Sequence, residues 1–194
     1  MVRAYPATPF FQMNKTFHRL KRPFFNRPTL KVAKELLGKV LVVGRASGRI
    51  NEVEAYIGQN DPACHAARGK TERNKVMFGR AGHLYVYFTY GMYHCANIVT
   101  EREHFPAAVL LRSIEPMEGI GLMEKRRGQS NHLADGPGKL CIALGLRKQA
   151  HNGLDLCAGK NAFVYDDGFK PKAIKKSPRI GIREGLDKHW RFYY

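Results

Sequence analysis

Two short β-rich segments separated by a glycine restrict the fold more than any other feature of this sequence. Leu84–Tyr90 and Tyr93–Val99 are rich in valine, isoleucine, threonine and tyrosine, the residue types that favour strands. Gly91 lies between them, and a glycine in so short a connection is typical of a hairpin turn. The pattern predicts an antiparallel β-hairpin, which needs further strands or a packed helix to be stable.

Other segments with strand or helix character follow at short intervals. The predicted strands are Lys39–Val43, Arg49–Ile57, Ala107–Ile114 and Arg179–Ile182, with a turn at Ala46-Ser47-Gly48. One predicted helix begins at Pro28 and stops at Gly38. Two others span Met117–Arg127 and Lys139–Leu144. Because turns rather than crossover helices join the strands, we expect one mixed α+β domain with helices packed on a mainly antiparallel sheet.

The chain carries a large excess of positive charge. With 33 Lys and Arg against 16 Asp and Glu, the formal net charge is +17 at pH 7. Such an excess indicates a polyanionic partner. Residues 1–50 hold eleven basic residues and one acidic residue, which gives a net +10. We expect residues 1–24 to form a basic, flexible arm that lies along phosphates; the alternative is a solvated tail that serves only solubility.

The remaining composition is that of an ordinary globular domain. Hydrophobic residues make up 44% of the chain and charged residues 25%, which argues against disorder. The longest apolar runs are far shorter than the roughly 20 residues that a membrane-spanning helix needs. The first six residues contain no apolar stretch, so we expect no signal peptide. The four cysteines are widely spaced, and we expect reduced thiols rather than a disulfide framework.

The segment Arg49–Ile57 brings two carboxylates together. Strand alternation places Glu52, Glu54 and Tyr56 on one face and the apolar residues between them on the other. A carboxylate beside an aromatic ring is suited to act as a general base. The alternative is that both carboxylates pair with surface lysine or arginine.

Tyrosine is concentrated in the predicted hairpin. Tyr85 and Tyr87 share a strand face, Tyr90 lies near the turn, and Tyr93 follows it. Aromatic ladders of this kind often serve core packing, but nucleic acid bases also stack on such rings for about 1–3 kcal/mol each, and an apolar wedge can unstack a duplex. In a protein of this charge, contact with nucleic acid is at least as good an interpretation.

Cys64-His65 and His94-Cys95 raise the question of a zinc site. No C-x-x-C pair accompanies them, and the zinc deaminase signature is missing as well. A P-loop and a dinucleotide-binding fingerprint are also missing. We therefore expect neither a metal nor a cofactor.

Gly136-Pro137-Gly138 precedes a predicted helix. Its main-chain N–H groups are candidates for binding a DNA phosphate, with Lys139 adding charge. An ordinary loop-to-helix turn explains these residues almost as well.

Taken in order along the chain, these residues resemble the alkyladenine (3-methylpurine) DNA glycosylase family. The matching segments are Glu52-Val53-Glu54-Ala55-Tyr56, His65, Met77-Phe78, Leu84-Tyr85-Val86-Tyr87, Tyr90-Gly91-Met92-Tyr93, Asn97, Leu110-Leu111-Arg112, Glu115-Pro116 and Gly136-Pro137-Gly138-Lys139-Leu140. Each motif alone is weak, whereas the ordered set is specific. The resemblance implies a single domain over residues 25–194, with a curved antiparallel sheet and a protruding hairpin that intercalates into DNA.

The resemblance also implies a role for each residue of the site. Glu54 would deprotonate the attacking water, and Arg112 would help to hold that water. The base pocket would consist of Tyr56, His65, Tyr87, Asn97 and Ile180, with Asn97 rejecting the exocyclic amine of guanine. The intercalating and backbone-binding group would consist of Tyr90, Met92, Tyr93, Gly138 and Lys139. Glu52 would lie outside the chemistry.

The implied activity is that of a monofunctional glycosylase of base excision repair. It would flip alkylated or deaminated purines, such as 3-methyladenine, 7-methylguanine, hypoxanthine and ethenoadenine, out of double-stranded DNA. Hydrolysis of the N-glycosidic bond by a Glu-activated water would leave an abasic site without strand cleavage. We expect a monomer, in the cytoplasm of a bacterium or the nucleus of a eukaryote. Two alternatives stay open, a non-catalytic basic nucleic-acid-binding protein and a one-carbon or acyl transferase domain reduced to binding.

Overall fold

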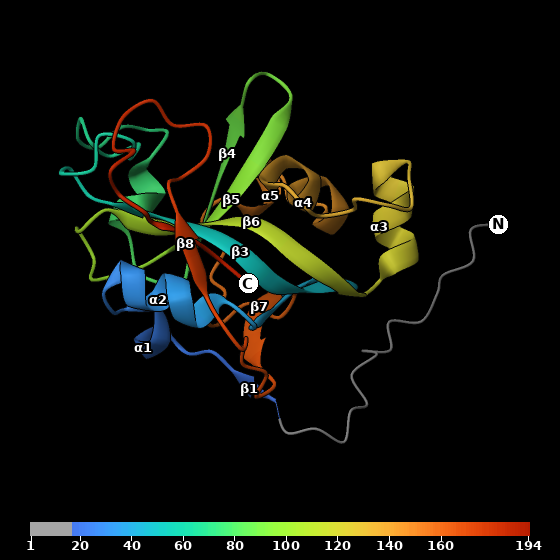
Figure 1. The fold of residues 1–194 in the computed structure, drawn as a ribbon. Coiled ribbons are helices and arrows are strands. Elements are labelled where there is room, and N and C mark those ends of the chain that lie inside the picture. Colours follow the sequence, from blue (N-terminus) through green and yellow to red (C-terminus); the bar gives the residue numbers. More distant parts are fainter. Residues whose placement is uncertain (1–16) are drawn as a thin grey trace.

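The computed structural model describes residues 17–194, which form one sheet with helices around it (Figure 1). The strands are β1 (His18–Arg19), β2 (Val40–Val43), β3 (Ala46–Ile57), β4 (Leu84–Thr89), β5 (Tyr93–Val99), β6 (Ala107–Glu118), β7 (Ala162–Asp166), β8 (Lys175–Ser177) and β9 (Arg191–Tyr193). The helices are α1 (Arg22–Phe25), α2 (Thr29–Leu36), the 3-10 helix η1 (Lys75–Phe78), α3 (Ile120–Arg127), α4 (Pro137–Leu144) and α5 (Lys148–His151). The predicted mixed α+β class is confirmed.

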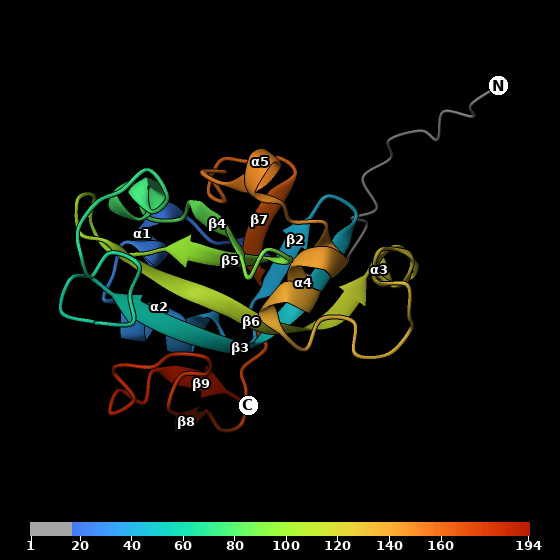
Figure 2. The ribbon, with the colours of Figure 1, turned by 90° about the horizontal axis from the view of Figure 1, so that it is seen from above.

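The strand order is β1-β7-β2-β3-β6-β5-β4, and every pairing is antiparallel. The long strand β3 lies in the middle. Along one side it pairs with β6, and along the other it pairs first with β2 and then with β9. Figure 2 shows β9 and β8 on the side of β3 that faces away from β6. The middle of β3 therefore lies inside the sheet, with a strand on either side.

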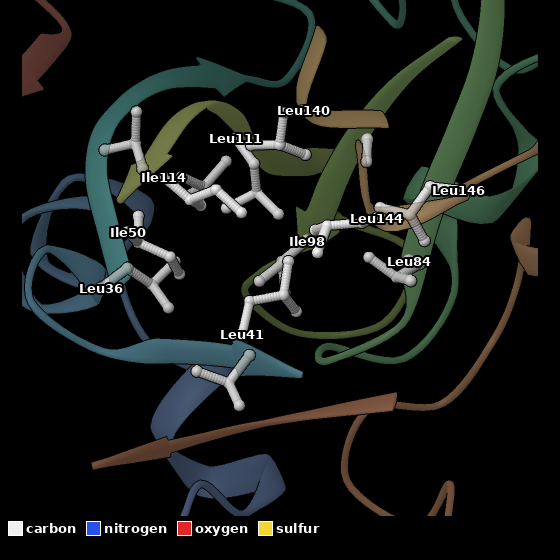
Figure 3. Packing of buried hydrophobic residues seen from close by; sticks show 14 of the residues in the cluster. Leu36, Leu41, Ile50, Leu84, Ile98, Leu111, Ile114, Leu140, Leu144 and Leu146 are labelled. Carbon is white, nitrogen blue, oxygen red and sulfur yellow. The ribbon is translucent and has the colours of Figure 1, made fainter. Parts of the chain in front are cut away.

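Buried side chains from the strands, α2 and α4 form the main hydrophobic core. Figure 3 shows Leu36, Ile50, Ile98, Leu111 and Leu140 pointing toward one another while the strands curve around them. Each fully buried side chain of this size contributes about 1.5–3 kcal/mol relative to exposure. In a second, smaller cluster, Cys64, Ala66 and Met77 of the segment that links β3 to β4 pack against Tyr85, Val99 and Ala108 of the sheet.

Three predicted boundaries are wrong, each for a local reason. The turn before β3 is at Gly44-Arg45, where Gly44 has φ +60°, and residues 46–48 already belong to the strand. Strand β6 continues to Glu118 because it pairs with the start of β3, so α3 begins only at Ile120. Gly119 makes this switch from strand to helix possible: its φ is +72°, and a Cβ there would lie 2.3 Å from the carbonyl oxygen of Arg45.

The C-terminal part of the chain also differs from its prediction. Arg179–Ile182 is a loop rather than a strand, and the strands of this region are β7, β8 and β9. The last two have three residues each and owe their conformation to pairing with each other and with β3. Such short segments carry too little alternation to be read from sequence.

Residues 18–24, which the sequence assigned to the basic arm of residues 1–24, belong to the folded part of the chain. Residues 1–16 lie outside the described part of the chain. From there on the chain is packed: β1 pairs with β7, Leu20 is buried, and Arg22 forms an ion pair of 2.5 Å with Asp155. Arg19, another of the charges assigned to the arm, is also used internally, since it donates to the main-chain carbonyls of Leu156 and Gly159.

The β4–β5 hairpin is confirmed, and it protrudes from the body of the molecule beside α4 and α5 (Figure 1). None of the helices in residues 17–194 has both the length and the apolar character to cross a membrane.

Candidate active site

A cavity of about 340 Å³ lies beside the base of the hairpin. Its lining comes from segments that are far apart in the sequence. The lining residues are Tyr56, Ala63, His65, Met77, Tyr85, Tyr87, Thr89, Tyr90, Cys95, Asn97, Leu110, Arg112, Pro137, Ile180, Gly181 and Ile182. The structure therefore brings all five predicted base-pocket residues, together with Arg112 and Tyr90, to one cavity.

Glu54 lies behind the wall of this cavity and is fully buried. Its Oε2 accepts a hydrogen bond of 2.8 Å from the Tyr56 hydroxyl, and its Oε1 accepts one of 2.7 Å from the main-chain N–H of Ile180. Nη1 of Arg112 lies 3.4 Å from the same Oε1. All three of these partners line the cavity, so the carboxylate is held directly beneath its surface.

Burial raises the pKa of Glu54 above its ordinary value. The Arg112 guanidinium, the N–H of Ile180 and the Tyr56 hydroxyl oppose this shift, but desolvation outweighs them. A carboxylate with a raised pKa holds a proton more readily than an exposed one does. This property favours a role as general base.

Arg112 owes its position to an irregularity of the sheet. Glu52 pairs with Ser113 and Val53 with Leu111, so Arg112 is an extra residue on β6 at this point. Such a β-bulge re-aims a side chain. Nε of Arg112 donates a hydrogen bond of 2.8 Å to Oε1 of Glu52. The same oxygen accepts a second hydrogen bond of 2.6 Å, from Nε of Arg191 on β9.

A second ion pair anchors the loop that carries Ile180. Nη1 and Nη2 of Arg179 lie 2.5 and 2.7 Å from the two carboxylate oxygens of Asp61, and both side chains are fully buried. The Arg179 guanidinium also donates to the main-chain carbonyl of Ala55 and packs over the Tyr56 and Trp190 rings. This pair therefore ties the loop before the cavity to the strand that carries Glu54.

Aromatic rings form one side of the cavity. The ring centroids of His65 and Tyr87 are 4.5 Å apart, at an interplanar angle of 71°. Nδ1 of His65 lies 2.9 Å from the Tyr85 hydroxyl, and the Arg73 guanidinium lies over the Tyr87 ring. Burial, assisted by Arg73, lowers the pKa of His65 to about 4, so its imidazole is neutral at pH 7.

Asn97 lies on β5 opposite Tyr85 and is buried in the cavity wall. Its Nδ2 donates a hydrogen bond of 3.1 Å to the main-chain carbonyl of Tyr85, which fixes the orientation of the amide. The amide oxygen and the second N–H are then left for a molecule in the cavity.

The hairpin tip presents two large side chains to solvent. Tyr90 is 79% exposed and Met92 is 64% exposed. Tyr90 and Gly91 have φ of +52° and +65°, and the N–H of Met92 bonds to the carbonyl of Thr89. Positive φ at both central positions is the requirement of a type I′ hairpin turn. Tyr90 therefore stands at the exposed tip of the hairpin and is also one of the residues that line the cavity.

The start of α4 lies against this hairpin. A Cβ on Gly138 would lie 3.1 Å from the Tyr93 ring, so glycine permits the close contact between helix and hairpin. The ammonium of Lys139 lies 2.9 Å from a carboxylate oxygen of Asp135. Asp135 therefore offsets part of the positive charge of Lys139, which the sequence analysis assigned to phosphate binding. Within residues 17–194, no three His, Cys, Asp or Glu side chains are arranged to hold a metal ion.

Sequence reasoning missed three residues of this network: Asp61, Arg179 and Arg191. Asp61 stands in a polar loop and both arginines stand in a basic C-terminal region, so nothing local sets them apart from surface charges. Glu52 was noticed, but its shared hydrogen bond depends on β9, which the sequence did not predict.

The sequence pattern described as Methylpurine-DNA glycosylase (MPG) matches residues 23–194. Three relatives bear the name "Putative 3-methyladenine DNA glycosylase". The relative from Methanocella arvoryzae is 50% identical over 184 residues, covering 90% of this chain and 91% of its own. Those from Sodalis glossinidius and Wolbachia pipientis wMel are 53% and 52% identical over 173 residues, covering 89% of this chain and 95% and 89% of theirs. The chain therefore belongs to the methylpurine-DNA glycosylase family.

Proposed function

We propose that this DNA glycosylase excises alkylated and deaminated purines, 3-methyladenine among them, with a water molecule activated by Glu54. The observation that carries the proposal is the fully buried Glu54 carboxylate beneath an aromatic-walled cavity. A protein that only binds nucleic acid has no use for such a group, because the cost of burying it is not offset by any contact with DNA.

The chemistry assigned to Glu54 is that of a general base. Each of its oxygens accepts one hydrogen bond in the free protein, and a carboxylate oxygen can accept two. A water held between Arg112 and Glu54 would attack C1′ of the flipped nucleotide and give its proton to Glu54. The bond between C1′ and the base breaks, the base leaves with the bonding electrons, and the sugar keeps a hydroxyl. A positioned general base contributes about 10²–10⁴-fold in rate.

The cavity favours alkylated purines over neutral lesions. Of its lining residues, His65 has a lowered pKa, whereas Tyr56, Tyr85, Tyr87 and Cys95 have raised ones, and burial is the main cause in every case. Each of these shifts favours the neutral form, so none of the five supplies a proton readily at pH 7. A cationic methylpurine leaves as a neutral base without being protonated. Hypoxanthine gains from protonation, and we propose slower excision for it.

Base selection and flipping are assigned to the remaining cavity residues. The Tyr56, His65 and Tyr87 rings would contact the flipped base, Ile180 would meet its edge, and Asn97 would crowd the exocyclic amine of guanine. Tyr90 would fill the gap left in the duplex. Met92 and Tyr93 would support it, with Gly138 and Lys139 close to the DNA backbone. Scanning and flipping of this kind need only a monomer.

The test uses three duplexes that share one sequence. One contains 3-methyladenine, one hypoxanthine and one only normal bases. Free base is measured by chromatography, and abasic sites are measured by strand cleavage after alkaline heating. We expect release of both lesions, 3-methyladenine faster, and no cleavage before the alkaline step. Tight binding with no base release would contradict the proposal, and cleavage before alkali would contradict the absence of lyase activity.

A further inference from the structure

Glu52 is the hydrogen-bond acceptor for two arginines at once. Its Oε1 accepts from Nε of Arg112 at 2.8 Å and from Nε of Arg191 at 2.6 Å. About one fifth of the Glu52 side chain is exposed to solvent. The exposed fractions of the Arg112 and Arg191 side chains are 14% and 20%. Charge-assisted hydrogen bonds with this much shielding from solvent are among the stronger ones in proteins.

The first of these hydrogen bonds sets the position of the Arg112 guanidinium. Fixing Nε limits the rotation of the side chain, and Nη1 then lies 3.4 Å from Oε1 of Glu54. Arg112 stands at a bulge, where the strand backbone constrains it less than in a regular ladder. Without Glu52, the guanidinium would be free to swing into the cavity that it lines.

The second hydrogen bond connects Glu52 to the loop of Ile180. Nη1 of Arg191 donates to Oγ of Ser177 at 3.1 Å, and Ser177 stands three residues before Ile180. Ile180 donates in turn to Glu54. These contacts form a closed ring, here called the circuit. It runs from Glu54 through Arg112, Glu52, Arg191 and Ser177, and returns along the chain to Ile180, which donates to Glu54.

This circuit is electrically balanced. Glu52 and Glu54 lie on one strand face and repel each other, which contributes to the raised pKa of Glu54. The two arginines neutralise them. Glu52 is therefore a means of holding two cations at fixed points around the buried carboxylate. The resemblance had left this residue outside the chemistry.

We propose that Glu52 is a positioning residue for base excision, which holds Arg112 at Glu54 and ties the Ile180 loop through Arg191. The proposal rests on the function proposed above. The length of the Glu52 side chain decides where the two guanidinium groups lie, because one oxygen must reach both of them, and the charge adds strength to the two hydrogen bonds.

Two conservative variants separate length from charge. Glu52→Gln keeps the length and the acceptor oxygen, and we expect a single-turnover rate of 3-methyladenine release within about threefold of wild type. Glu52→Asp keeps the charge but is one methylene shorter, and we expect a loss of about 10–100-fold, the usual scale for a misplacement near 1 Å. Affinity for the lesion duplex should stay within about twofold in both. Glu115→Gln, an exposed carboxylate on β6, is the matched control and should not change the rate.

A double variant tests whether Glu52 acts through Arg112. Glu52→Asp combined with Arg112→Ala should be no more than about threefold slower than Arg112→Ala alone, because the two residues act as a unit. A fast Glu52→Asp or a slow Glu52→Gln would overturn the positioning role. Losses that multiply in the double variant would overturn the part of it that runs through Arg112. Those outcomes leave the proposed function standing, provided that wild type releases 3-methyladenine. If wild type releases none, both proposals fall together.

Discussion

The side chains of Asp61 and Arg179 form a bidentate ion pair that is wholly shielded from solvent, with O–N distances of 2.5 and 2.7 Å. The pair joins a loop after β3 to the loop that precedes Ile180. Ile180 follows Arg179 directly, and its main-chain N–H donates a hydrogen bond to Glu54. The ion pair, which lies outside the cavity, therefore helps to position one of the hydrogen-bond donors of the buried carboxylate.

Removing one partner should be costly. Asp61→Asn leaves the buried Arg179 charge uncompensated, and we expect a loss of about 3–5 kcal/mol in the free energy of unfolding, measured by urea denaturation. Glu72→Gln removes one partner of an exposed ion pair with Lys75 and is the control, with an expected effect of about 0–1 kcal/mol. Equal effects of the two substitutions would show that the buried pair adds nothing.

The carboxylate of Glu54 can be replaced by an amide of the same shape. Glu54→Gln keeps the shape of the side chain but cannot accept a proton from water, so base release should fall by at least about 10²-fold. Binding to a lesion duplex, measured by fluorescence anisotropy, should change little, because the residue is covered and does not reach DNA. Excision at the wild-type rate would exclude Glu54 as the base.

The pH dependence of excision follows from the raised pKa of Glu54. The carboxylate must be ionised to accept a proton, so the single-turnover rate should fall as pH drops through a value above 4.5, the ordinary one for glutamate. Stability should respond with the opposite sign: a group whose pKa is higher in the folded than in the unfolded state favours folding as it becomes protonated. Acidification should therefore stop excision without any loss of stability from the protonation of Glu54. Rates between pH 4.5 and 8, corrected for spontaneous base loss, would test this. A rate that stays flat to pH 4.5 would contradict it.

Local sequence was sufficient to place residues that lie on one strand. Alternation along β3 put Glu52, Glu54 and Tyr56 on one face, and the hairpin was predictable from a glycine between two β-rich runs. The choice of Glu54 rather than Glu52 came only from the family resemblance. The family resemblance supplied Arg112, Asn97 and Ile180, which alternation alone does not connect to Glu54.

The long-range contacts could not be predicted from the sequence, because each depends on how distant segments pair in the folded chain. The bulge at Arg112 depends on the register between β3 and β6, and the shared hydrogen bond of Glu52 depends on a three-residue strand near the end of the chain. Asp61 and Arg179 are 118 positions apart, and as isolated residues each has the character of a surface charge. Such pairings are set by tertiary packing and leave no periodic signal.

The exposed ring of Tyr90 leads to a prediction about binding. Tyr90→Ala should weaken affinity for a lesion duplex by about 5–150-fold, which corresponds to 1–3 kcal/mol of lost stacking. Since the side chain is 79% exposed, the free energy of unfolding should stay within about 0.5 kcal/mol. Tyr90→Phe keeps the ring and is the control. An alanine variant that binds as tightly as wild type would remove the wedge role from Tyr90.

The N-terminal charge can be tested by two truncations that the structure separates. Residues 1–16 contain two basic residues, Arg3 and Lys15, so their deletion should reduce the slope of log affinity against log salt by at most about 2, at about 0.9 per phosphate contact. Excision at saturating protein should not change. Deletion to residue 22 also removes β1, the buried Leu20 and the ion pair of Arg22 with Asp155, so it should lower the melting temperature as well. If the longer deletion leaves the melting temperature unchanged, β1 contributes nothing to the fold; if the shorter one reduces the slope by much more than 2, residues 1–16 affect DNA binding through more than their charge.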